Sequence, residues 1–302
     1  MGEKIYYYTD FNTFKLILEN GTLRFKESTK SNDHLDTIKI FEGMNEYKDT
    51  KIKPLGDEDT TVLQFAGNCL KCLPNDMSQK YLVACFTKKK DSRLLWDAYT
   101  MNRKDRKSEA YNGVCIEFDV EKLNDRLHEA DIECDTKYIK TVKYGKEEIN
   151  SFLDEEYGKY LEEYKFLKDD RDQQQNIIQT IVLENVQIDF KKSVVYPLFK
   201  LYCTILCEAP IFKDTFWQEE DEIRAVFVLN KKHIVNNEIK IDNRDSYYYD
   251  LAIDENCISN IILGPELQEK EICELKNLKG KIDFTKLKNE KSIGTGVIRS
   301  SN

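Results

Sequence analysis

The sequence lacks any segment that would carry it into or across a membrane. Across its 302 residues, no apolar run approaches the length of about 18 residues that a bilayer-spanning helix needs. The chain starts with "MGEKIYYYTD", which has no apolar stretch of the kind found in secretion signals. We therefore expect a cytoplasmic protein with no membrane partner.

Histidine is scarce, and the common catalytic motifs are missing. The chain has three histidines, His34, His128 and His233, and their spacing marks no nucleophile–base pair. It contains no GxxxxGKS/T phosphate loop, no HExxH, no GxSxG and no strand-linked GxGxxG. These absences leave the carboxylates as the candidates for chemistry.

The cysteines do not form the pattern of a disulfide framework, because there are nine and most lie in apolar runs. Cys69 and Cys72 form a CxxC, and Cys203 and Cys207 lie one helical turn apart, so a four-thiolate zinc site is one interpretation. The second pair lies in "FKLYCTILCEAP", which is typical of a buried helix. We favour reduced thiols and predict no metal.

The charge of the chain argues against broad nucleic-acid binding, because its net value is −9 at pH 7. Residues 88–107 differ from the rest, with eight Lys or Arg against three Asp. Two interpretations stay open for this stretch. It is either a solvated loop face or a local patch that contacts phosphates.

Hydrophobic patterns predict strands at both ends of the chain. The first forty residues favour a strand–helix–strand unit, with Asp10 capping the helix and Gly21 ending it. Continuous apolar runs predict strands at 80–87 and 112–119, and further strands are expected at 136–145 and after residue 216. Between the first two of these, "DSRLLWDAY" favours a helix with Leu95, Trp96 and Tyr99 facing inward.

The middle of the chain has a helical pattern. From residue 146, apolar side chains recur at three- and four-residue spacing, starting with Ile149, Phe152 and Leu153. We therefore predict one α+β domain over 1–302, with a mixed or antiparallel sheet and an inserted helical subdomain at 146–209.

The stretch "FWQEEDEIRAVF" at 216–227 packs four carboxylates beside one arginine. Glu220 and Glu222 are two residues apart, so in a strand both side chains lie on one face, with Arg224 next on that face. Such a pair of carboxylates suits a reaction whose transition state resembles a positively charged sugar ring. One carboxylate stabilises the positive charge, and the other orients or deprotonates the attacking group. The alternative is a charged strand start with an internal salt bridge.

Three blocks follow one another along the chain. They contain "IYYYTDF" and "LILENGTLRFKEST", then "VACFTKKKDSRLLWDAYTMN" and "NGVCIEFD", and finally "FKDTFWQEEDEIR". In their order and spacing these blocks resemble the bacterial family DUF2971. The last block has the spacing K-x-x-x-W-x-x-E-x-E-x-R, met by Lys213, Trp217, Glu220, Glu222 and Arg224. A weaker fourth block is "ISNIILGPEL".

The same blocks also resemble a degenerate ADP-ribosyltransferase layout, which implies a fold of that type. The resemblance implies catalytic roles for Thr87, Glu220 and Glu222, and leaves Glu219 and Asp221 as bystanders that face away. Tyr7 stands where that superfamily has a basic residue.

The resemblance further implies NAD as a substrate and large or cationic side chains around it. The residues implied as its contacts are Tyr7, Arg24, Trp96, Tyr99 and Arg224. Core packing is the alternative role for Trp96, Tyr99 and Trp217.

The function expected from this resemblance is transfer of ADP-ribose from NAD to a nucleic-acid or protein acceptor. The setting it suggests is a bacterial toxin or anti-phage defence component with an antitoxin partner. Two alternatives stay open. One is a non-catalytic sensing or interaction module on the same fold, and the other is a metal-dependent nuclease that uses Glu220, Glu222 and Asp33.

Overall fold

The computed structural model describes residues 2–28, 38–47, 80–100, 112–168, 195–230, 233–234, 239–243 and 245–292. Backbone contacts divide the chain into two compact units. The first consists of Met1–His34, Gln79–Val142 and Phe216–Asn302, and the second of Leu35–Ser78 and Lys143–Thr215. Within the described ranges, no helix has the length and apolar character that a membrane crossing requires.

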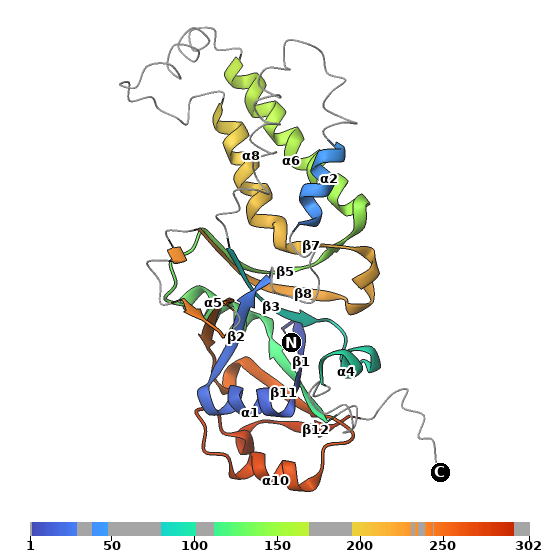
Figure 1. Ribbon diagram of the computed structural model, residues 1–302, viewed down its shortest axis with the longest axis vertical. Coiled ribbons are helices and arrows are strands. Elements are labelled where there is room, and N and C mark those ends of the chain that lie inside the picture. The colour runs from blue at the N-terminus through green and yellow to red at the C-terminus, as the bar shows by residue number, and fades with distance from the viewer. Residues whose placement is uncertain are drawn as a thin grey trace. The chain divides into compact units, whose positions relative to one another are not determined.

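The first unit is built on a ten-stranded sheet (Figure 1). Its strands are β1 Lys4–Asp10, β2 Thr22–Glu27, β3 Lys80–Thr87, β4 Gly113–Asp119, β5 Thr136–Thr141, β8 Glu222–Leu229, β9 Lys240–Ile241, β10 Tyr247–Ala252, β11 Ile258–Leu263 and β12 Asn289–Lys291. The strand order is β12-β11-β4-β1-β3-β2-β10-β9, with β8 paired to β3 and β5 paired to β8. All of these pairs are antiparallel except β11 with β12. The predicted α+β class with a mainly antiparallel sheet is confirmed.

The sheet divides at β3. Strand β8 pairs along the whole of β3, from Lys80 to Thr87, and so occupies one edge of it. Strands β2 and β1 share the other edge, since β2 pairs at Leu82 and Val83 and β1 pairs at Thr87. Between Val83 and Thr87 neither described strand pairs with this edge. Cys85 therefore lies where β1 and β2 part.

One face of the sheet carries the main core. Helices α1 (Phe11–Asn20), α5 (Val120–Glu129) and α10 (Glu269–Asn277) bury their apolar sides on it. Helix α1 begins and ends as the sequence predicts. The Asp10 side chain accepts a hydrogen bond from the Thr13 amide at 3.0 Å, and Gly21 adopts a left-handed φ of 58° after the last turn.

The opposite face carries a smaller apolar cluster under α4 (Arg93–Tyr99). Leu95 and Trp96 of this helix pack on Tyr8 and Cys115 of the sheet. The Trp96 indole meets the Tyr8 ring nearly edge-on, with 5.1 Å between the ring centroids. Helix α4 is therefore fixed to the face opposite the main core.

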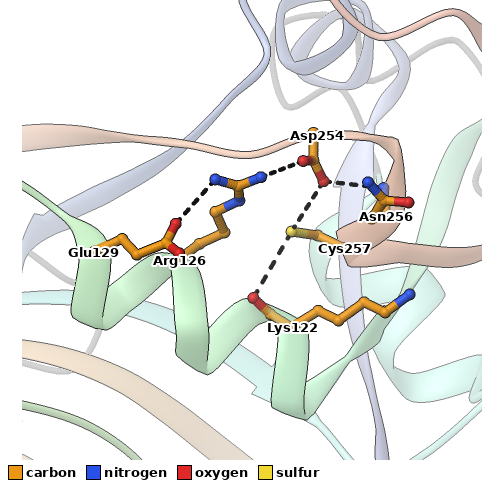
Figure 2. A network of polar contacts seen from close by, with 6 residues as sticks. All are labelled: Lys122, Arg126, Glu129, Asp254, Asn256 and Cys257. Carbon is orange, nitrogen blue, oxygen red and sulfur yellow. Dashed lines mark hydrogen bonds and ion pairs between the residues drawn. The ribbon is translucent and has the colours of Figure 1, made fainter.

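A polar network joins α5 to the turn before β11 (Figure 2). Arg126 is ion-paired with Asp254 and, at 2.9 Å, with Glu129. Asp254 also accepts the Asn256 amide at 3.0 Å, which caps the short helix η7 (Glu255–Cys257). The contacts close on one another inside the unit, so the network serves as a brace between α5 and β11.

The second unit is mainly helical. Its elements are α2 Lys39–Tyr47, α6 Gly145–Lys168, α8 Val195–Glu208, the short helix η5 Ala209–Ile211, and the two-residue strands β6 Lys143–Tyr144 and β7 Phe212–Lys213. Helix α6 packs against α2 and α8 (Figure 1). The predicted block at 146–209 lies in this unit together with residues 35–78, a companion that the sequence pattern did not indicate.

Alanine substitutions at two glycines are expected to change the unfolding free energy in opposite directions. A methyl group at Gly21 meets a left-handed φ and lies 3.0 Å from Lys281 Cβ, whereas one at Gly158, inside α6, meets nothing within 4 Å. We expect Gly21→Ala to cost about 1 kcal/mol of unfolding free energy and Gly158→Ala to add about 0.5–1 kcal/mol. Urea denaturation of both variants tests this. A stabilised Gly21→Ala protein would contradict the assigned C-cap.

Candidate functional site

The strand β8 places Glu222 and Arg224 on the face opposite the main core. Ile223 and Ala225 belong to that core, so alternation turns their neighbours the other way. Across the ladder, Glu222 pairs with Thr87 of β3 and Arg224 pairs with Cys85. Side chains at paired positions share a face, which brings these four residues together.

Glu222 and Arg224 form a buried ion pair. The Arg224 Nε donates to Glu222 Oε1 at 2.8 Å, and Nη2 donates to Oε2 at 3.1 Å. Arg224 is 0% exposed and Glu222 is 4% exposed. The two-residue spacing therefore allows a bidentate ion pair within one strand. This ion pair offsets much of the desolvation free energy that burying both charges costs.

Glu220 reaches the same region by a different route from the one predicted. It ends the short helix η6 (Thr215–Glu220), and Asp221 then adopts a positive φ of 46° before β8 begins. The prediction that strand alternation orients Glu220 is therefore wrong, because the backbone is not extended at this point. Glu219 is exposed and ion-paired with Lys89.

Thr87 holds this turn in place. Its hydroxyl donates to the backbone oxygen of Glu220 at 2.7 Å and accepts from the Lys89 amide at 3.0 Å. The Lys88 amide also donates to the backbone oxygen of Asp221 at 3.1 Å. Thr87 therefore pairs with Glu222 across the ladder and bonds to the backbone of Glu220, but its hydroxyl contacts backbone and not a carboxylate.

Tyr99 is the side chain that joins α4 to the acidic pair. Its hydroxyl donates to Glu220 Oε1 at 2.5 Å. Burial, followed by the charges of Glu220, Cys85 and Glu222, raises the pKa of the Tyr99 phenol well above its usual range. The residue as a whole is 41% exposed, so its hydroxyl end lies inward while part of its ring faces solvent.

Tyr7 lies on the core side of β1, and its ring centroid is 5.7 Å from that of Phe86. Burial, together with Cys85 and Asp10, raises the pKa of Tyr7 to about 12. Cys85 thus lies within electrostatic reach of both Tyr7 and Tyr99, at the division of the sheet. This exposed thiol was missed by the sequence reasoning, because it lies inside an apolar run typical of a fully buried strand.

Two further residues that were predicted to contact NAD, Arg24 and Trp96, bond to other side chains. Arg24 forms a fork with Asp250 at 2.7 and 3.1 Å and lies over the Tyr248 ring, 4.0 Å from its centroid. Trp96 is 2% exposed and donates from its indole nitrogen to Asp91 at 2.8 Å. The structure therefore brings together Thr87, Tyr99, Glu220, Glu222 and Arg224, and places Arg24 and Trp96 in other contacts.

Most basic side chains in the described part of residues 88–107 form ion pairs with acidic side chains. Lys89 is paired with Glu219 at 3.3 Å, and Lys90 with Glu290 at 2.9 Å. Arg93 lies 4.0 Å from Asp97. These pairs favour the solvated-face interpretation for residues 88–93, while residues 101–107 lie outside the described ranges.

Metal binding finds no support in the described part of the chain, where no three His, Cys, Asp or Glu side chains gather to hold an ion. Cys69, Cys72 and Asp33 lie outside the described residues. Cys203 and Cys207 are reduced and half-buried in α8.

Comparison with known families matches part of the chain, including Tyr99, Glu220, Glu222 and Arg224 but not Thr87. Residues 95–225 match the family described as protein of unknown function (DUF2971). The DUF2971 resemblance is thereby confirmed, and the match runs from α4 through the start of β8. The N-terminal block that we compared with DUF2971 lies outside the matched residues. No curated protein and no solved structure is significantly similar to the chain.

The ion pair of β8 gives a stability prediction. We expect Glu222→Gln to lower the unfolding free energy by about 3 kcal/mol, because Arg224 loses the charged oxygens of its fork while staying buried. Replacing both residues by leucine is expected to cost less. As a matched control, Asp250→Asn breaks the more exposed fork of Arg24 and is expected to cost about 1 kcal/mol or less. Equal losses for Glu222→Gln and Asp250→Asn in urea denaturation would contradict the structural role of the pair.

Proposed function

We propose that this chain is an ADP-ribosyltransferase-like enzyme that cleaves NAD and transfers ADP-ribose to an acceptor. The observation that carries the proposal is a pair of buried carboxylates, Glu220 and Glu222, which are 8% and 4% exposed and lie beside Tyr99. Burying two carboxylates close together costs free energy. Such clusters are concentrated at functional sites, where the charges serve chemistry.

The reaction breaks the bond between the nicotinamide nitrogen and ribose C1′. Both bonding electrons go to nicotinamide, which leaves as a neutral base. The acceptor forms the new bond to C1′ and loses its proton. Carboxylates stabilise the positive charge that develops on the ribose, and one of them takes the acceptor's proton.

The residues present suit the nicotinamide–ribose end of NAD. The partly exposed Tyr99 ring offers a planar surface to the pyridinium, and the carboxylates lie next to its hydroxyl. The pyrophosphate end is less well matched by the described cations. Arg24 and Arg224 are both held in carboxylate forks, and we do not assign either of them to a phosphate.

The acceptor class proposed from the resemblance is a nucleic acid or a protein, in a toxin or anti-phage setting with an antitoxin partner. The acidic pairing of Lys89 and Lys90 favours the protein acceptor, because paired lysines bind phosphates less strongly. Toxicity on expression that is lost in Glu220→Gln would support this setting.

A non-catalytic interaction module is the second candidate. It is favoured by the engagement of Thr87, whose hydroxyl contacts two backbone groups, and of Glu222, whose two oxygens accept from Arg224. In that case Thr87, Glu220, Glu222 and Arg224 stabilise the sheet where β1 and β2 part, and the exposed surface around them binds a partner.

Turnover of NAD separates the two candidates. We expect the wild-type protein, incubated with labelled NAD and protein or nucleic-acid acceptors, to release nicotinamide and label an acceptor. Glu220→Gln is expected to reduce the rate by about 100-fold or more. Glu219→Gln, an exposed neighbour, serves as the matched control and keeps the wild-type rate. Absence of nicotinamide release with every acceptor would refute the enzyme and leave the interaction module.

Ligand binding is testable without turnover through Cys85. Its thiol lies across the ladder from Arg224 and within reach of Tyr99, so bound NAD is expected to cover it. We expect NAD to slow alkylation of Cys85 by iodoacetamide several-fold, measured by mass spectrometry. Cys273 of α10 is also exposed and provides the control within the same molecule. Equal alkylation of both thiols with and without NAD would place the ligand elsewhere.

A further inference from the structure

The spacing W-x-x-Y in α4 has a structural explanation that connects it to the acidic pair. Trp96 and Tyr99 are three residues apart and so lie on neighbouring positions of one helical side. Trp96 is buried against Tyr8 and bonded to Asp91, whereas Tyr99 is partly exposed and bonded to Glu220. Trp96 thus anchors α4 to the sheet, and Tyr99 contacts the acidic pair.

The anchor of α4 is well defined. The Asp91 side chain that accepts the Trp96 indole also accepts the Ser292 hydroxyl at 2.5 Å. At the other end of the helix, the Thr100 amide and hydroxyl both donate to the backbone oxygen of Trp96, at 3.2 and 2.6 Å. The backbone that carries Tyr99 is therefore held before and after that residue.

Glu220 is fixed from two sides. Its backbone oxygen accepts the Thr87 hydroxyl at 2.7 Å, and its Oε1 accepts the Tyr99 hydroxyl. A phenol that donates to a carboxylate limits the rotation of that carboxylate. Helix α4 is packed on the sheet, and β3 is one of its strands. These two contacts therefore set where the Glu220 carboxylate lies.

We infer that Tyr99 is the positioning residue of this site, holding Glu220 as an oriented acceptor through its hydroxyl, and that Trp96 fixes the helix that presents it. This differs from the role in which the Tyr99 ring only contacts the cofactor. The kinetic part of the inference rests on the proposed function, while the contact itself does not.

The contact is tested by NMR of the chain labelled with ¹³C at tyrosine Cζ. The Tyr99 signal is assigned as the one that disappears in Tyr99→Phe. In Glu220→Gln the acceptor becomes neutral, and we expect the Tyr99 signal to shift at neutral pH while that of Tyr47 stays unchanged. Tyr47 is a suitable reference because its hydroxyl donates to Asp154 at 2.6 Å in the second unit. A Tyr99 signal that is identical in Glu220→Gln would overturn the inference.

The role is tested by nicotinamide release. We expect Tyr99→Phe to reduce kcat about tenfold with KM changed by less than about twofold, because the ring stays and only the bond to Glu220 is lost. Tyr47→Phe, which removes an equivalent bond elsewhere, is expected to match the wild type in both constants. A raised KM with unchanged kcat in Tyr99→Phe would overturn the inference in favour of ring stacking. If the wild type releases no nicotinamide but the Tyr99 signal shifts in Glu220→Gln, the contact is supported and the proposed function alone fails.

Discussion

The burial of Arg224 is the constraint on which the rest of the site depends. A guanidinium at the centre of a sheet needs an ionised partner close by, since its transfer from water is costly. Glu222 supplies both oxygens from two positions earlier on the same strand. This fixes where β8 begins. The Glu222 backbone oxygen accepts the Val142 amide at 2.9 Å, and the Asp221 backbone oxygen accepts the Lys88 amide at 3.1 Å. The residues that follow β5 and β3 thus both bond to the start of β8.

The start of the strand in turn determines the place of Glu220. An extended chain would carry its side chain along the line of Glu222 and Arg224. The positive φ of Asp221 instead reverses the backbone, and the bond from Asp221 N to the Gln218 oxygen at 3.1 Å closes the turn. Asp tolerates the left-handed region better than most residues, which suits it to this position. Glu220 then meets Tyr99, which arrives from a helix on the same face of the sheet.

Sequence patterns predict those parts of this structure that depend on local physics. The apolar run at 80–87 predicts β3, because a strand whose side chains are mostly buried has few polar positions. Asp10 and Gly21 predict the limits of α1 through capping chemistry. The shared face of Glu222 and Arg224 follows from the two-residue period of a strand.

The parts that escape prediction depend on tertiary contacts. The bond between Tyr99 and Glu220 joins residues 121 positions apart, and no local pattern encodes it. The parting of β1 and β2 beside the exposed Cys85 is a property of strand pairing and not of composition. The turn at Asp221 is equally hidden, because the two-residue spacing of Glu220 and Glu222 and the apolar run that follows them favour an extended chain. All three features lie around the acidic pair, so local patterns are least informative at the proposed site.

The division of the sheet provides a physical reason for a site at this place. A strand edge that is left unpaired between two neighbours has backbone groups without ladder partners. At β3 this edge coincides with an exposed thiol and lies next to two buried carboxylates and a phenol. A fold selected only for stability would close the gap and replace the acids by apolar residues, since well-packed apolar side chains are often as stabilising as buried ion pairs. The two buried carboxylates beside an exposed thiol therefore favour a functional role over a purely structural one.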